Sequence, residues 1–260
     1  EIYTLSLHDA LPIFGRTTEL LSLRAARENG LRMDWSNFRA DVPNRMGRVV
    51  LDPVSVTEII PYINWKFFFH AWNLSAKFHT ITHVGMCGHC RAQWLTMFPE
   101  QDRAKAQEAF RLYDDAREML QQFIDMDVEY IKAVFGLYEA YSVDDDVVVN
   151  GRSFPMLRQQ KRNEKECYLS LSDFVAPKVS GKKDYAGLYA VTAGAGTDYL
   201  MGKYRREGDA YKELLMKSLL DRLAEAATEW LHHRIRKEYW GYAPDRKSTR
   251  LNSSHLAESR

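Results

Sequence analysis

The sequence predicts an α+β fold, in which long helices flank an antiparallel sheet. Residues 102–124 and 209–239 carry apolar side chains at the three- and four-residue spacing of amphipathic helices. Between these segments, Asn150-Gly151 separates two short β-prone runs, which is the strongest local signal for a two-residue hairpin. Helices before and after a hairpin are typical of the α+β class.

Composition limits the classes of partner. The chain has 260 residues, 45% of them hydrophobic, and a net charge of +1 at pH 7. A near-neutral chain lacks the basic excess of nucleic-acid or anionic-membrane binders, so we expect neither partner. Three cysteines are too few for a disulfide framework, and no apolar run is long enough to span a membrane. We therefore expect a cytoplasmic location.

Both ends of the chain read as foreign sequence. Residues 1–13 and 245–255 each back-translate, codon for codon, as a common sequencing adapter in frame. We expect residues 1–13 and 245–260 to be adapter-derived and non-native, with both natural termini cut off. The alternative is a short apolar N-terminal element and a polar, disordered tail.

The N-terminal part, residues 14–50, is predicted to hold a short helix and a linker. Residues 19–29 have a helical pattern, and Gly30 is a good helix stop because glycine tolerates the left-handed conformation. Residues 34–50 mix proline, glycine and charges with few periodic apolar positions. We interpret them as an arm that enters a domain starting near Leu51.

Helical spacing continues through an aromatic segment at residues 57–74, which Pro61 divides. Its aromatic side chains are expected to face the core, and they are Trp65, Phe68, Phe69 and Trp72. The long helix at residues 102–124 follows. Its apolar stripe consists of Ala106, Ala109, Tyr113, Ala116, Leu120 and Phe123.

Strands are predicted in the middle of the chain. Residues 130–137 and 184–193 are apolar and β-prone, and the hairpin occupies residues 147–154. A glycine-rich turn over 193–196 ends the last strand. The final helix then carries an apolar stripe of Leu215, Leu219, Leu223, Ala227, Trp230 and Ile235.

Cys87-Gly-His-Cys90 is the most specific short motif. A C-x-x-C pair can lower one thiol pKa for disulfide exchange or supply half of a zinc site. The surrounding pattern is not thioredoxin-like, and no second such pair lies at zinc-finger distance. We therefore favour two small, partly buried residues in a loop. A thiol oxidoreductase would instead reduce insulin and lose that activity on Cys87→Ser, and we expect no such activity.

Other candidate motifs are weaker. Residues 192–196 (TAGAG) lack the spacing of a phosphate-binding loop and are interpreted as a turn. His232 and His233 are adjacent and cannot share one helix face, so a solvated face is the preferred interpretation. The acidic run at 144–146 lacks the calcium-loop pattern and is interpreted as a solvated turn. We expect no resident metal, and these motifs define no catalytic residues.

Three blocks carry a family resemblance. Residues 62–72 (YINWKFFFHAW), 172–194 (SDFVAPKVSGKKDYAGLYAVTAG) and 221–244 (DRLAEAATEWLHHRIRKEYWGYAP) resemble the activation domain of cobalamin-dependent methionine synthase, in the family's order. The LRQQ sequence at 157–160 also matches. The resemblance covers essentially all of residues 50–244.

The resemblance implies a C-shaped α+β domain with a bent antiparallel sheet and flanking helices, and it makes residues 51–244 a partial activation domain. In this family the domain binds S-adenosylmethionine as methyl donor and helps to repair oxidised cobalamin by reductive remethylation. A flavodoxin-type protein supplies the electron. Cobalamin is bound by another module of the parent methyltransferase, which serves methionine biosynthesis, and zinc belongs to its homocysteine module. The fragment alone is expected to be inactive.

Asn64 is the site residue that the resemblance assigns. It occupies the place of the acidic residue in the family's YIDW block, which binds the amino group of S-adenosylmethionine. An amide still accepts a hydrogen bond but gives up its charge-assisted part. Glu225 could supply a carboxylate instead, although an exposed helix glutamate is the plainer interpretation.

The family's R-x-x-x-G-Y-P segment, whose arginine holds the methionine carboxylate, would lie beyond Pro244. We therefore expect weak binding or none, because a buried carboxylate without its arginine is costly. The alternative is a docking-only module for the cobalamin domain and flavodoxin, without methyl-donor binding.

Overall fold

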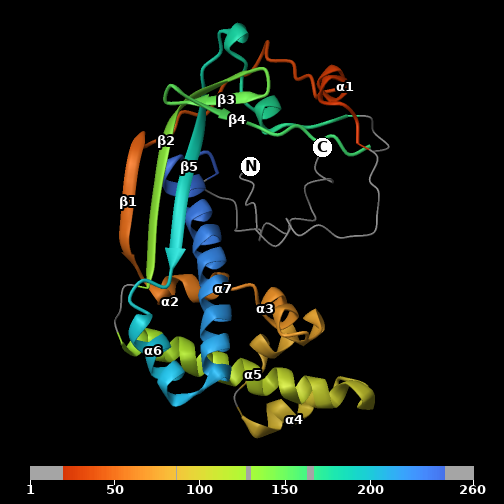
Figure 1. Ribbon diagram of the computed structural model, residues 1–260, viewed down its shortest axis with the longest axis vertical. Coiled ribbons are helices and arrows are strands. Elements are labelled where there is room, and N and C mark those ends of the chain that lie inside the picture. The colour runs from red at the N-terminus through yellow and green to blue at the C-terminus, as the bar shows by residue number, and fades with distance from the viewer. Residues whose placement is uncertain (1–19, 86, 127–129, 163–166, 244–260) are drawn as a thin grey trace. The chain divides into compact units, whose positions relative to one another are not determined.

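The computed structural model describes residues 20–85, 87–126, 130–162 and 167–243. Its helices and strands (Figure 1) are, in order, α1 (Leu23–Glu28), β1 (Gly47–Val54), α2 (Val56–Ile59), α3 (Trp65–Ala71), α4 (Gly88–Thr96), α5 (Glu100–Asp125), β2 (Ile131–Val143), β3 (Asp146–Val149), β4 (Arg152–Pro155), β5 (Asp184–Ala193), α6 (Asp198–Glu207) and α7 (Ala210–Arg234). Shorter 3-10 segments lie at Ile60–Tyr62, Ala76–His83, Leu171–Phe174 and Lys178–Ser180, and a π-helical turn at Ile235–Tyr239 follows α7. The predicted α+β class is confirmed.

The five strands form one sheet in the order β1-β2-β3-β4, and β5 pairs with β2 off this path. The ladders from β1 to β4 are antiparallel. Asn150 and Gly151 connect β3 to β4 with φ values of 50° and 77°. Positive φ at both central positions is what a two-residue hairpin turn requires, so the predicted hairpin is confirmed.

The chain divides into two compact units. The first contains residues 1–42 and 138–186, and the second contains residues 43–137 and 187–260. The first unit has a small apolar cluster of Ala140, Val147 and Val149.

A buried ion network lies in the same unit. Arg158 donates hydrogen bonds to the carboxylates of Asp145 and Asp173, and Arg27 donates to Asp145 from α1. The solvated interpretation of residues 144–146 was therefore wrong for Asp145, which is 7% exposed. Its burial is possible because these guanidinium groups replace water around the carboxylate.

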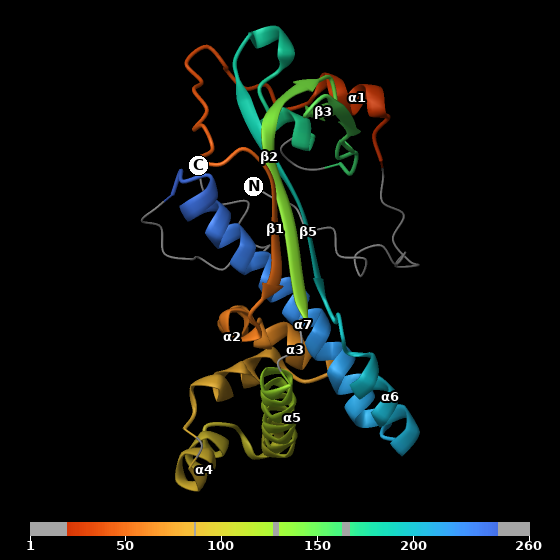
Figure 2. The same cartoon turned by 90° about the vertical axis from the view of Figure 1, so that its left-hand side faces the viewer.

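The second unit contains the main core. The predicted α7 stripe is buried, from Leu215 through Trp230, and α5 contributes its predicted alanine and leucine positions. Phe68 and Phe69 of α3 are fully buried, as expected, while Trp65 and Trp72 are partly buried. Figure 2 shows α4 beside α5 at one end of this unit.

Several elements differ from the predictions. The predicted arm at residues 34–50 contains the start of strand β1, because Gly47 pairs with Leu137 and Val50 with Val134. The Cys87–Cys90 motif lies at the start of α4 rather than in a loop. The predicted foreign ends, 1–13 and 245–260, lie outside the described residues and stay predictions.

Candidate functional site

Asn64 lies immediately before α3, where the chain leaves a 3-10 turn. The backbone at Asn64 has φ −85° and ψ 89°, and its carbonyl accepts a hydrogen bond from Phe68 N–H. The side chain makes no capping bond to the helix. Its Oδ1 atom is buried and has no hydrogen-bond partner in the described part of the chain.

A buried acceptor without a partner is expensive. Leaving such a group unsatisfied costs roughly 1–3 kcal/mol, so native proteins seldom tolerate it without a functional reason. Because Asn64 Oδ1 can accept a hydrogen bond, it fits a donor such as a ligand ammonium group. This residue type therefore suits the role that the sequence resemblance assigned to position 64.

A tyrosine–histidine pair links the neighbouring turn to α7. Tyr62 Oη lies 2.8 Å from His233 Nδ1. Burial lowers the pKa of His233, and Lys237 and Arg236 lower it further. Burial also raises the pKa of Tyr62, assisted by Glu229 and Glu58. A neutral imidazole and the tyrosine hydroxyl share one hydrogen bond, whose direction depends on the histidine tautomer, and this bond fixes the orientation of both rings.

His232 and His233 differ sharply despite being adjacent. His232 is 5% exposed, and its ring packs edge-on against Tyr189 at 5.0 Å between centroids. The solvated interpretation was therefore wrong for His232, and it was also wrong for the hydrogen-bonded His233. Both Nε2 atoms are buried without a partner in the described part of the chain. Two further polar atoms in this unit are thus left unpaired near the carboxyl end of α7.

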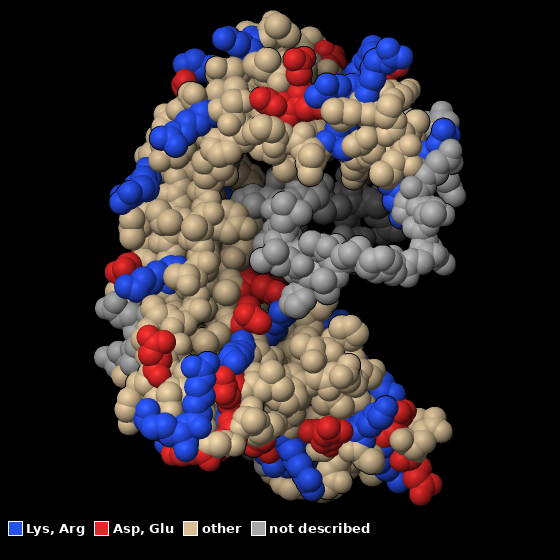
Figure 3. Space-filling model, in the orientation of Figure 1, with Lys and Arg blue, Asp and Glu red and all other residues tan. Residues whose placement is uncertain are grey.

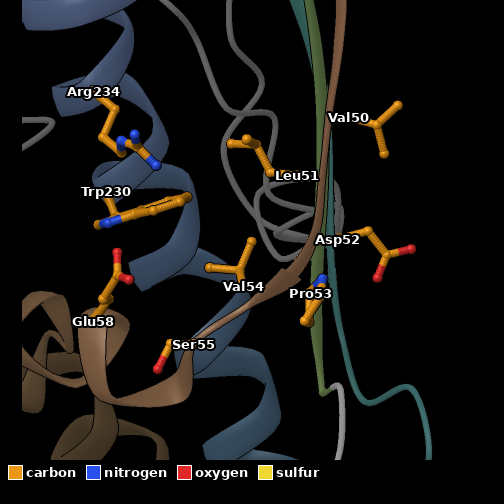
Figure 4. A pocket seen from close by; sticks show the side chains of 9 residues that line it. All are labelled: Val50, Leu51, Asp52, Pro53, Val54, Ser55, Glu58, Trp230 and Arg234. Carbon is orange, nitrogen blue, oxygen red and sulfur yellow. The ribbon is translucent and has the colours of Figure 1, made fainter.

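A shallow hollow of about 230 Å³ lies where the end of β1 meets α2 and α7. Figure 4 shows Leu51 and Val54 turned toward Trp230, while Val50 and Asp52 point away. Glu58 and Arg234 flank the Trp230 ring in the same view. The Arg234 guanidinium lies 5.2 Å from that ring centroid and pairs with Glu238 at 2.7 Å. Arg234 therefore already places a cation beside the aromatic ring of this hollow.

The remaining predicted residues do not join this site. Glu225 pairs with Arg222 at 2.7 Å, and its side chain is about half exposed. This agrees with the interpretation of Glu225 as an exposed helix glutamate. Gly194 and Gly196 have positive φ and form the predicted turn before α6. The sequence analysis did not predict the contact between Tyr62 and His233, because helical periodicity does not reveal a contact between residues 171 positions apart. It also did not predict the hollow, whose lining comes from separate parts of the chain.

Charged side chains of both signs are mixed on the visible surface, where Figure 3 shows lysine and arginine side chains interspersed with aspartate and glutamate. In the described residues, no cluster of three or more histidine, cysteine, aspartate or glutamate side chains could hold a metal ion. The same residues include no helix with the length and apolar character needed to cross a bilayer.

Comparison with known proteins agrees with the geometry. The family model described as "Vitamin B12 dependent methionine synthase, activation domain" matches residues 55–258. A solved structure, "Crystal Structure of the MetH Reactivation Domain bound to AdoHcy", is 34% identical in sequence with a TM-score of 0.74. The match covers 88% of this chain and 67% of that chain. This chain therefore belongs to the family of vitamin B12-dependent methionine synthase activation domains.

Proposed function

We propose that this activation domain binds S-adenosylmethionine and presents its methyl group to a cobalamin carried by another module of the parent methionine synthase. The observation that carries the proposal is the similarity to a reactivation domain with S-adenosylhomocysteine bound, the product left when the methyl group has gone. The unpaired Oδ1 atom of Asn64 supports it from this chain's own residues.

Asn64 would hold the ammonium group of the ligand. Its amide oxygen accepts one hydrogen bond, but without the charge of a carboxylate the contact is weaker. The proposal assigns binding and orientation of the ligand to Asn64 and no proton transfer.

The family resemblance suggests the partners. The cobalamin module would supply the methyl-accepting chemistry, and a flavodoxin-type protein would supply the electron. S-adenosylmethionine that has lost its methyl group is S-adenosylhomocysteine. The present domain would hold the methyl donor while this transfer occurs. Methionine biosynthesis in the cytoplasm is the corresponding cellular role that we propose.

Calorimetric titration with S-adenosylhomocysteine tests the proposal. We expect saturable binding, weaker than the low-micromolar range, that disappears in Asn64→Leu because leucine offers no acceptor. Gln121→Leu is a matched amide control on the exposed surface of α5, where Gln121 donates a hydrogen bond to Asp125 at 2.8 Å, and it should bind as the wild type does. Circular dichroism verifies that each variant is folded.

A docking-only module is the second candidate. The observation that favours it is the amide at position 64 in place of the family's carboxylate. Such a module would bind the cobalamin domain and flavodoxin without a methyl donor. Folded wild-type protein that shows no heat of binding and no saturation would overturn the methyl-donor proposal and favour docking alone.

A further inference from the structure

The dithiol at Cys87 and Cys90 lies apart from the Asn64 region in the sequence and has its own chemistry. Cys87 is the N-cap residue of α4, a helix of nine residues, and its side chain is exposed. Its sulfur accepts a hydrogen bond from Cys90 N–H at 3.2 Å. The Sγ atoms of Cys87 and Cys90 lie 2.6 Å apart, in direct contact.

The environment favours a thiolate on Cys87. Hydrogen bonding to the Cys90 side chain, and then to the Cys90 backbone, lowers the pKa of Cys87 below its usual value. The positive end of a helix dipole acts in the same direction at this position. The same side-chain contact raises the pKa of Cys90, followed by burial. The pair therefore contains one thiol suited to attack and one suited to retain its proton.

The helix that carries the pair is held firmly against its neighbours. The Arg91 guanidinium makes two contacts with Asp114 of α5, at 2.9 and 3.0 Å, and stacks 4.1 Å from the Phe110 ring centroid. Trp94 is 3% exposed and donates its indole N–H to Thr80 at 2.9 Å. These contacts hold α4 against α5 and against the 3-10 segment Ala76–His83.

The backbone at Gly85 leaves room for the sulfur of Cys90. A Cβ atom placed on Gly85 would lie 3.2 Å from Cys90 Sγ. That distance is shorter than ordinary van der Waals contact, so glycine at 85 provides the space that the Cys90 thiol occupies. The pair therefore fits its surroundings without moving the backbone at residue 85.

We propose that Cys87 and Cys90 form a thiol–disulfide exchange site that reacts with low-molecular-weight disulfides. The Cys87 thiolate attacks one sulfur of such a disulfide, which forms a mixed disulfide and expels the first thiolate. Cys90 then loses its proton and attacks Cys87 Sγ, which closes the intramolecular disulfide and expels the second thiolate. The protein loses two electrons and two protons, and the small disulfide becomes two thiols.

The proposed activity is the reversible formation of a disulfide between Cys87 and Cys90. Turnover of protein disulfides is a separate activity, and the surrounding fold is not thioredoxin-like. The inference is independent of methyl-donor binding, because neither cysteine contacts Asn64 in any interaction described above.

Mass spectrometry of the whole chain after equilibration with oxidised and reduced glutathione tests the proposal. Trypsin releases both cysteines in one peptide, residues 78–91, and places Cys167 in another. Oxidation should convert the 78–91 peptide to a form lighter by two hydrogen atoms, and excess reduced glutathione should restore it. A peptide that keeps both thiols in excess oxidised glutathione would overturn the proposal.

Single variants assign the two roles. Cys90→Ser should accumulate a mixed disulfide with glutathione on Cys87, because the resolving thiol is absent. Cys87→Ser should form that adduct on Cys90 more slowly, because Cys90 is less exposed than Cys87 and lies inside the first turn of α4 rather than at its N-cap. Serine is a good N-cap, so Cys87→Ser retains the start of α4. Equal rates for the two variants would contradict the assigned roles.

Cys167→Ser is the matched control. It removes the third cysteine of the chain, outside the 78–91 peptide, and should leave oxidation of that peptide unchanged. Loss of the lighter peptide form in Cys167→Ser would overturn the proposal by showing that oxidation at 87 and 90 depends on the remote thiol.

Discussion

The two units differ in how their buried polar groups are paired. In the first unit, the Arg158 guanidinium bonds two carboxylates and the Tyr168 carbonyl. In the second unit, Asn64 Oδ1, Arg91 Nε and the Nε2 atoms of His232 and His233 are buried with no partner in the described part of the chain. A satisfied network is characteristic of architecture, whereas unpaired groups call for a functional account.

The largest expected effect concerns the satisfied network. Arg158→Met should lower the free energy of unfolding by about 3–5 kcal/mol, because it leaves Asp145 and Asp173 buried without their shared cation. Urea denaturation followed by circular dichroism measures the change. Arg24→Met breaks an exposed pair with Glu28 at 3.7 Å and should change stability by less than about 0.5 kcal/mol. A similar loss of unfolding free energy in both variants would contradict the distinction between the buried ion network and an exposed ion pair.

The next effect concerns the pH dependence of His232. Burial, with a smaller contribution from Arg236, lowers its pKa from 6.5 to about 4. Between these two pH values the unfolded histidine is protonated and the folded one is neutral, so protons favour unfolding. Full stability is therefore present above pH 6.5, and lowering the pH to about 4 should cost roughly 3 kcal/mol from this group.

His232→Leu tests that dependence. Stability measured from pH 7 to pH 4 should fall less steeply in the variant, because leucine takes up no proton. The comparison uses the difference between the two pH values and so does not depend on how well leucine packs against Tyr189. Parallel curves for wild type and variant would show that His232 is not the buried neutral group described here.

The smallest effect sharpens the comparison at Asn64. Asn64→Asp should tighten binding of S-adenosylhomocysteine about fivefold, or by about 1 kcal/mol, because a hydrogen bond to an ionised acceptor is stronger than one to an amide. Calorimetry against the wild type checks this. Unchanged or weaker affinity would show that the ligand ammonium group does not contact position 64.

Local patterns account for the parts of the fold that the sequence revealed. Asn150-Gly151 predicted its hairpin because few other residue pairs accept positive φ twice. Leu215 and Leu219 predicted the buried face of α7 because helical spacing depends only on near neighbours.

The missed features depend on partners far along the chain. Asp145 looked like a solvated turn residue, but it is buried against Arg158 and against Arg27, which is 118 positions away. β1 was hidden because Gly47 and Pro53 are poor strand formers, and pairing with β2 overrides that local preference. Asn64 was found only through family resemblance, since no spacing rule distinguishes one asparagine before a helix from another.

Nuclear magnetic resonance of side-chain amides tests the central claim most directly. In ¹⁵N-labelled protein titrated with S-adenosylhomocysteine, the Asn64 side-chain amide should shift in a saturable manner. The Gln160 side-chain amide, which donates to the Leu21 carbonyl at 2.8 Å in the first unit, should stay in place. Equal shifts at both residues, or none at Asn64, would contradict the claim that the unpaired acceptor marks the ligand site.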